Sequence, residues 1–238
     1  MDNQPKIELL QAEVDENDQS FSRLLVDGRS IKYITVEPGI YSSEDMCFGP
    51  SLVSILPKLP AGDWNDGLVA KDAKDDQPHF AYCTLIQFPG VQNTWHRTYV
   101  NYLELSIGRK LRTGIYEAKC LLFDDDIIVA KFARFPWEIQ CMENETTAYQ
   151  WISGRNIGPP FLGHLTENGR VIGFLMERIT DESDMGIQID FLVHDSKATL
   201  IDFDTAQKCD DRNLLLQEFE NLTVRLKDPS GRGGGGLL

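Results

Sequence analysis

The sequence predicts an α+β fold in which antiparallel strands outnumber helices and the two are not interleaved. Residues 99–133 contain three successive runs of alternating apolar and polar residues separated by short turns, a pattern typical of an antiparallel meander. Residues 136–154 then change to a helical period. With 238 residues, 42% of them hydrophobic, the chain can bury the core of one large domain or two small ones.

The N-terminal part, residues 1–98, is predicted to be a β-rich extension. Its clearest signal is "FSRLLVDGRSIKYITVEPG" at residues 21–39, in which two alternating strands flank Asp27-Gly28, a dipeptide that favours a tight hairpin turn. Residues 80–88, "FAYCTLIQF", are also strand-like.

The central part, residues 99–180, is predicted to hold a sheet and one amphipathic helix. The helix is expected to begin near Pro136, a residue suited to a first turn, and to end at Gly154. The expected strands are "YVNYLELSIG" (99–108), "GIYEAKCLLF" (114–123), "DIIVAKFA" (126–133), "FLGHLTEN" (161–168) and "RVIGFLMERI" (170–179), the last two joined around the turn Glu167-Asn168-Gly169.

The C-terminal part is short. In residues 181–228 we expect a hairpin formed by "QIDFLVHD" and "ATLIDFDTA", followed by a helix in "RNLLLQEFENLTVRLKD". Residues 229–238, "PSGRGGGGLL", are expected to be disordered because they are too rich in glycine to order by themselves.

Composition excludes several classes of function. The net charge is −14 and the acids are spread along the chain, which argues against nucleic acid as a partner. The five cysteines are far apart and the four histidines lack ligand spacing, so we expect neither a zinc site nor a disulfide framework. No apolar stretch approaches the ~18 residues of a membrane span, and no secretory leader is evident. We therefore expect no membrane partner and a soluble, cytoplasmic protein.

Five features that suggest chemistry occur in a particular order. Gly108 and Gly114 near the first turn of the meander come first, then Lys131 at the end of its third strand, glutamates on the helix, "MERI" and finally "IDFD". This order resembles the small lobe and metal-binding segment of the protein-kinase-like fold, found in protein kinases and in choline and aminoglycoside kinases. Within that superfamily the chain is most similar to fungal kinase-like proteins of unassigned substrate, through "ARFPWEIQCMENETTAYQWISGRNIGPPFLGHL" and "DWNDG".

The resemblance covers nearly the whole chain and implies an ATP-dependent phosphotransferase with Mg²⁺. It implies a small lobe with an antiparallel sheet and one αC-type helix, preceded by the extension and followed by a truncated large lobe. Lys131 would contact the α- and β-phosphates, beneath a loop that contains the two glycines. Its helix partner would be Glu145, which precedes two apolar helix positions by four and seven residues. Glu143 and Glu138 are the alternatives.

The resemblance also implies a base-binding and a metal-binding segment. Met176 would lie behind the adenine, while the backbones of Glu177 and Ile179 would offer an acceptor and a donor to its edge. Asp202 would bind the metal ion, and Asp204 replaces the glycine of the family's Asp-Phe-Gly segment. Two acids around an aromatic residue would repel each other without a cation, which favours this interpretation.

The chain departs from the family between these two segments. Only eleven residues, "TDESDMGIQID" at 180–190, stand where the family has a linker, a central helix and the catalytic loop. In helix they would span only ~16 Å. Asp190 occupies the metal-binding asparagine position, whereas the catalytic-base position falls on Met185, with Asp184 one residue out of register. We infer a degenerate family member or a shortened gene product with severely impaired phosphoryl transfer.

Two alternatives stay open. The chain is either kinase-like with a partial nucleotide site, or a non-catalytic, pseudokinase-type interaction module whose surface, left bare by the missing helix, binds a protein partner or a second copy. A glycosidase-type hydrolase is a remote third reading, because such enzymes need two spaced carboxylates beside a sugar pocket and the sequence shows no repeated strand-helix barrel. The acceptor substrate is equally open between protein and small molecule.

Overall fold

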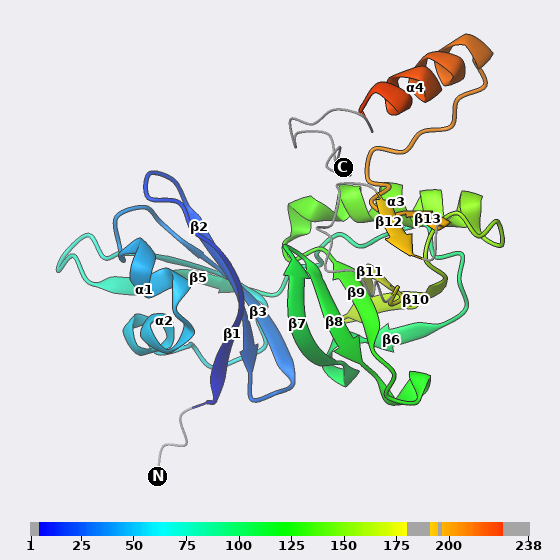
Figure 1. Cartoon of the computed structure of the whole chain (residues 1–238). Coiled ribbons are helices and arrows are strands. Elements are labelled where there is room, and N and C mark those ends of the chain that lie inside the picture. The colour runs from blue at the N-terminus through cyan, green and yellow to red at the C-terminus, as the bar shows by residue number, and fades with distance from the viewer. Residues whose placement is uncertain (1–4, 180–190, 195–196, 226–238) are drawn as a thin grey trace. The chain divides into compact units, whose positions relative to one another are not determined.

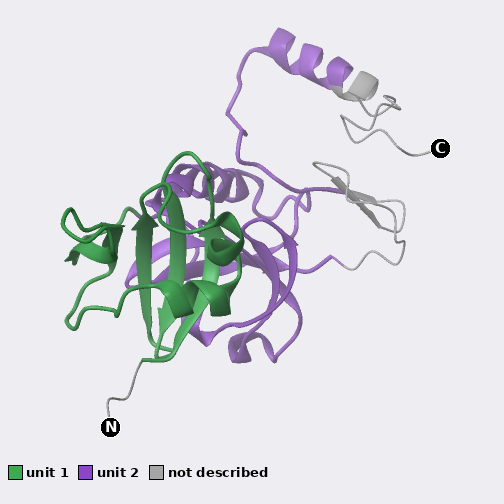
Figure 2. Ribbon diagram, turned by 90° about the vertical axis from the view of Figure 1, so that its left-hand side faces the viewer, with its two compact units in different colours: residues 1–89 green, residues 90–238 purple. Residues whose placement is uncertain are grey.

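The computed structural model describes residues 5–179, 191–194 and 197–225 (Figure 1). The chain folds as two compact units, residues 1–89 and residues 90–238 (Figure 2). Each unit contains one mixed β-sheet, and helices are few. The predicted α+β class is therefore confirmed.

The first unit ends earlier than the predicted extension, at residue 89 compared with residue 98. The segment between these points is bonded to the second unit. The backbone N–H of Val91 donates to the carbonyl of Val171 at 2.9 Å, and the indole of Trp95 donates to the carbonyl of Thr146 at 3.0 Å. These bonds join residues that are about 50 to 80 positions apart, so a local sequence pattern does not reveal them.

The first unit is a five-stranded sheet of order β1-β2-β3-β4-β5, antiparallel except for the parallel pair β3/β4. The predicted hairpin is present as β2 and β3, and its turn residues Asp27 and Gly28 have φ of 54° and 66°. Helix α2 packs against β1. The elements are β1 (Ile7–Glu13), β2 (Ser20–Val26), β3 (Ser30–Val36), α1 (Ser43–Cys47), α2 (Gly49–Ile55), β4 (Asp66–Lys71) and β5 (Pro78–Thr84).

Two cations are buried in this first unit. Arg23 is completely buried and donates to Gln11 Oε1 at 2.6 Å. Lys32 is 7% exposed; its Nζ donates to the carbonyl of Trp64 and lies 3.9 Å from the centre of the Trp64 ring. Burial lowers the pKa of Lys32, and Asp63 opposes this effect only in part.

The second unit is built on a six-stranded sheet of order β6-β10-β11-β9-β8-β7. Among the strand pairs that the structure describes in this sheet, only β6 and β10 are parallel. The turn between β10 and β11 is formed by Asn168 and Gly169, with φ of 49° and 79°, as the sequence predicts. The strands are β6 (Tyr99–Asn101), β7 (Ser106–Arg112), β8 (Ile115–Lys119), β9 (Ile128–Phe132), β10 (Phe161–Glu167) and β11 (Arg170–Glu177).

The predicted first strand of the meander, residues 99–108, is wrong as a single element. It is divided into β6 and the start of β7 by a 3₁₀ turn, η1 (Tyr102–Glu104). Asn101 causes the break, because its side chain accepts the backbone N–H of Leu103 and caps the turn. Gly108 consequently lies inside β7 and not in the turn, whereas Gly114 does lie in the β7/β8 turn.

The predicted helix is present as the 3₁₀ turn η3 (Pro136–Glu138) and helix α3 (Ile139–Ile152), followed by Gly154 with φ of 74°. Helix α3 packs against β11, and Figure 1 shows it running along one side of the sheet. Its buried positions follow the 3.6-residue period: Ile139, Met142, Glu145, Thr146, Ala148 and Tyr149. The buried Glu145 is the exception to an otherwise uncharged face.

A buried histidine fastens the segment before β6 to this sheet. His164 on β10 is completely buried, and its Nε2 accepts the backbone N–H of His96 at 3.1 Å. Burial, with a smaller contribution from His96, lowers the pKa of His164 to about 4. His164 is therefore a neutral core residue at physiological pH.

The predicted C-terminal hairpin is present as β12 (Phe191–His194) and β13 (Lys197–Leu200), which pair antiparallel. Helix α4 (Arg212–Arg225) follows, and its side chains from Arg212 to Asn221 are all exposed. The predicted glycine-rich tail lies outside the described residues. Among the helices that the structure describes, none has the length and apolar character needed to cross a membrane.

Candidate functional site

Three charged side chains meet on the α3 side of the second unit's sheet. Lys131 Nζ lies 2.7 Å from Glu145 Oε2 and 2.8 Å from Asp202 Oδ1. The side chains of Lys131 and Glu145 are 10% and 1% exposed, whereas that of Asp202 is 31% exposed. The cluster of these three residues, which we call the lysine cluster, carries one more negative than positive charge and is open to solvent on the Asp202 side.

Three elements from distant parts of the sequence build this cluster. Lys131 is on β9, which is hydrogen-bonded on both sides by β8 and β11, so its backbone is fixed. Glu145 is on the buried face of α3. Asp202 follows β13 and has φ of 68°, in the left-handed region that acids occupy more readily than most residues.

Phe203 anchors the segment that carries Asp202. Its ring is 8% exposed and lies edge-to-face with Tyr149 at 5.1 Å between centroids. Its backbone N–H also hydrogen-bonds the Glu145 carboxylate. The segment is therefore held against α3 by both ring packing and a main-chain bond.

Burial and charge shift the pKa values of the cluster. Burial acts to lower the pKa of Lys131, but the charges and hydrogen bonds of Glu145 and Asp202 outweigh it, so the pKa is raised. Burial raises the pKa of Glu145, and Lys131 offsets this only partly. Burial also raises the pKa of Tyr149 well above its ordinary value. Lys131 is thus held charged despite its burial.

The two alternative glutamates have other partners. Glu143 accepts the backbone N–H groups of Gln92 and Asn93, at 2.5 and 3.1 Å. Glu138 pairs with Arg134. The helical spacing that favoured Glu145 thus selected the residue that the structure brings to Lys131.

Glycines allow the strands around Lys131 to approach closely. At Gly173 on β11, a Cβ would lie 2.1 Å from the backbone oxygen of Lys131. At Gly114, with φ of 71°, it would lie 2.9 Å from the backbone oxygen of Phe132. At Gly108 it would lie 3.2 Å from the backbone oxygen of Glu117. Gly108 and Gly114 thus have local packing reasons to be glycine, and Gly173, which the sequence analysis missed, has the strongest.

The predicted base-binding segment lies at the end of β11. Met176 is 8% exposed, and the Tyr149 hydroxyl donates to its sulfur at 3.3 Å. The backbone N–H of Glu177 donates to the carbonyl of Pro160 at 2.9 Å. Ile179 is half-buried at the end of this described range. Met176 and Lys131 occupy neighbouring strands of one sheet, two residues apart in register.

The predicted metal ligands are described only in part. The backbone oxygen of Asp204 accepts the side-chain amide of Asn144 at 3.1 Å, which ties this residue to α3. Asp190, Met185 and Asp184 lie outside the described residues. Within the described ranges, no group of three or more His, Cys, Asp or Glu residues is placed to hold a metal ion. A metal ion at Asp202 would therefore need further oxygen ligands from a bound molecule or from water.

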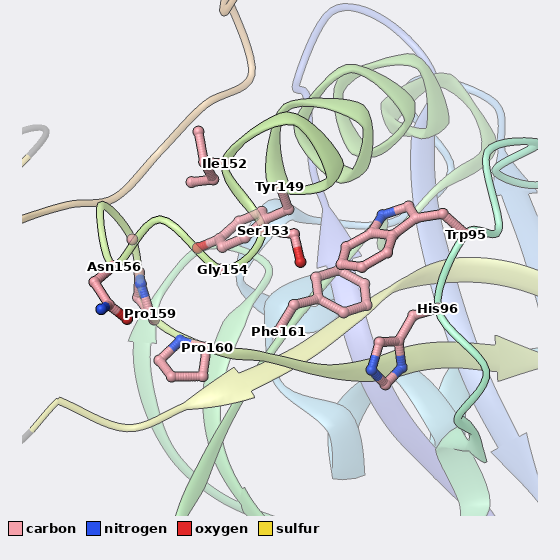
Figure 3. A pocket seen from close by; sticks show the side chains of 11 residues that line it. Trp95, His96, Tyr149, Ile152, Ser153, Gly154, Asn156, Pro159, Pro160 and Phe161 are labelled. Atoms are coloured by element: carbon pink, nitrogen blue, oxygen red, sulfur yellow. The ribbon is translucent and has the colours of Figure 1, made fainter.

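A separate hollow of about 240 Å³ lies beside the C-terminal end of α3 (Figure 3). Tyr149 lines the hollow and also packs against Phe203, so it separates the hollow from the lysine cluster. The other lining residues include Trp95, His96, Ser153, Asn156 and Phe161. The sequence analysis assigned no role to this region.

The chain matches no protein-family model, and no curated protein and no solved structure resembles it significantly.

Proposed function

We propose that the second unit is a kinase-like domain that binds a nucleoside triphosphate with Mg²⁺ through Lys131 and Asp202. The observation that carries the proposal is the position of Lys131 Nζ between Glu145 and Asp202, at 2.7 and 2.8 Å. Glu145 alone is enough to neutralise this lysine. Asp202 is therefore a second acid that can exchange the lysine for another cation, and it is also the more exposed of the two.

Electrostatics support a ligand that contains both charges. A cluster with an excess negative charge attracts a divalent cation. Once that cation has replaced Lys131 at Asp202, the ammonium of Lys131 can pair with a nearby phosphate group. A magnesium-bound triphosphate brings both partners at once. Burial of Lys131 strengthens this attraction, because the local dielectric constant is lower than in water.

The donor set fits Mg²⁺ of the kind found with nucleotides. Such ions are commonly bound through one or two carboxylates, with phosphate and water oxygens as the other ligands. Asp202 would supply the carboxylate, and Asp204 and Asp190 are the further acids that the family resemblance assigns to the metal site. The ion would neutralise phosphate charge, while Lys131 orients the phosphates and Glu145 holds Lys131.

We further propose that phosphoryl transfer is weak or absent. The eleven residues 180–190 contain no residue in register to serve as the catalytic base, since that position is Met185. Positioning of the acceptor hydroxyl is a large part of what kinases contribute. The function proposed is therefore nucleotide binding, with residual transferase activity at most.

A thermal-shift titration with Mg-ATP tests nucleotide binding. A ligand at 100 times its dissociation constant stabilises the folded state by about 2.7 kcal/mol, so the melting temperature should rise measurably. Lys131→Met should remove this rise. Lys32→Met is the matched control, because it changes a buried lysine of the other unit and should leave the rise intact.

The result that would contradict the proposal is equally direct. If Mg-ATP leaves wild type unchanged, or shifts the Lys131→Met variant as much as wild type, then the lysine cluster is an ion network that serves the fold alone. The same titration with Mg²⁺ alone reports whether Asp202 holds the cation before a nucleotide arrives.

A second candidate function, a non-catalytic interaction module, is favoured by helix α4. Four large apolar side chains of this helix are about half or more exposed: Leu214, Leu215, Leu216 and Phe219. Self-association through this helix would cover them. Light scattering tests this function: the mass of wild type should exceed that of the monomer, and Leu215→Glu should return the mass to that of the monomer, whereas a monomeric wild type would exclude self-association.

A further inference from the structure

An ion pair crosses the sheet of the second unit. In the predicted nucleotide site it lies at the end that would hold the base, away from the end that would hold the phosphates. Glu117 Oε1 on β8 lies 2.8 Å from Nε of Arg178, the residue that follows β11. In the sheet β9 lies between β8 and β11. The Arg178 side chain therefore reaches over the end of β9 to a strand that is not its neighbour.

Strand register places this ion pair on the same face as Lys131. Cross-strand partners direct their side chains to one face, and along each strand every second residue does so. Ile115, Lys131 and Phe174 form one such row across β8, β9 and β11. The next row contains Glu117, Val129 and Met176.

The second row is where a base would lie if the triphosphate is held by Lys131. Val129 and Met176 are apolar but buried, at 6% and 8% exposed, so a flat ring can pack against them only after the groups that cover them move aside. Glu117 and Arg178 have side chains that are 15% and 27% exposed, so solvent still reaches the pair. A base entering this row would either desolvate the pair or have to separate it.

We propose that the Glu117–Arg178 ion pair is a latch over the base end of the nucleotide site, and that it lowers affinity for a nucleobase until it opens. This inference rests on the proposed nucleotide function. The latch connects strand β8 to the segment after β11. A bound base must separate these two parts or slide between them.

A second arginine provides an internal control. Arg109 on β7 also contacts Glu117, at 3.0 Å, but its side chain is 66% exposed and it approaches from the neighbouring strand β7. Removing it leaves the Arg178 contact across β9 in place. Removing either arginine takes one positive charge away from Glu117, but only Arg178 reaches Glu117 across β9. Comparing the two variants therefore distinguishes the effect of the cross-strand contact from the effect of the lost charge.

Adenosine is the probe that isolates the base end, because it lacks phosphates. Isothermal titration should show adenosine binding about two- to fivefold more tightly to Arg178→Ala and to Glu117→Val than to wild type, since a partly exposed ion pair no longer has to be broken. Arg109→Ala should bind as wild type does. Added salt should strengthen adenosine binding to wild type and leave Arg178→Ala unchanged, because salt screens the latch.

The outcomes separate this inference from the function on which it rests. Equal adenosine affinity in wild type, Arg178→Ala and Glu117→Val would overturn the latch. If those variants bind adenosine more tightly but Lys131→Met binds Mg-ATP as well as wild type does, the latch stands and the phosphate site falls. If neither wild type nor the variants bind adenosine or Mg-ATP, both are overturned. Circular dichroism on each variant confirms that it is folded.

Discussion

Each unit of this chain buries a lysine, and the two lysines have different surroundings. Lys32 in the first unit donates to a backbone carbonyl and lies over an indole ring, and its pKa is lowered by burial. Lys131 in the second unit lies between two carboxylates, and its pKa is raised although burial opposes the change. Two lysines that are buried to a similar extent thus have pKa values shifted in opposite directions.

The difference shows how a structural lysine is distinguished from a candidate ligand-binding one. Lys32 is held by a backbone carbonyl and an indole ring, and neither of these groups is a charged partner that a ligand could replace. Lys131 has one acid more than it needs, and that acid, Asp202, is the most exposed member of its cluster. Partner chemistry, and not burial alone, is therefore the informative quantity.

The largest expected effect comes from removing each lysine in turn. Lys131→Met should lower the free energy of unfolding by about 3 to 5 kcal/mol, because it leaves Glu145 buried without its cation. Lys32→Met should cost only about 1 kcal/mol, the scale of one lost hydrogen bond. Urea denaturation measures both, and hydrogen exchange of peptides assigns each loss to its unit. Equal costs would remove the distinction between the two lysines.

Glycine substitutions compare the backbones of the two units. Gly173→Ala should cost about 3 kcal/mol, because its Cβ would meet the Lys131 carbonyl at 2.1 Å and force β9 and β11 apart. Gly39→Ala, with φ of 74° and nothing within 4 Å, should cost about 1 kcal/mol from backbone strain alone. Denaturation by urea measures both. A small loss of unfolding free energy in Gly173→Ala would mean that β9 and β11 can move apart at low cost.

Acid should destabilise the second unit through His164, over a window set by its shifted pKa. Because the folded pKa is lowered to about 4 from 6.5, the stabilisation is complete above pH 6.5 and is lost as pH falls toward 4. The full loss is on the order of 3 kcal/mol. Stability measured against pH should show this slope in wild type and lose it in His164→Asn. An unchanged slope in the variant would assign the acid sensitivity to other groups.

Much of the fold could be predicted because its signals are local. The α+β class, the hairpin turn at Asp27-Gly28, the helix that ends before Gly154 and the turn at Asn168-Gly169 all depend on turn chemistry or period over a few residues. The break between β6 and β7 was missed, because an asparagine cap at residue 101 competes with an otherwise strand-like pattern.

The candidate site was predictable to the extent that order and helical period determine it. The resemblance to the kinase-like fold implied Glu145, through its spacing toward the core, and Asp202, through "IDFD"; the structure brings both to Lys131. Register across three strands is not encoded locally. The close approach at Gly173 and the contact of Glu117 with Arg178 therefore had no signal in the sequence that a local pattern could reveal.

The left-handed backbone at Asp202 restricts which amino acids can occupy that position. At φ of 68° glycine and asparagine fit almost as easily as aspartate, whereas most other residues are strained. A single nucleotide change can convert an aspartate codon to either of these two. The carboxylate can therefore be lost by mutation with little penalty in folding, so its presence or absence in homologous chains would record selection on ligand binding separately from selection on stability.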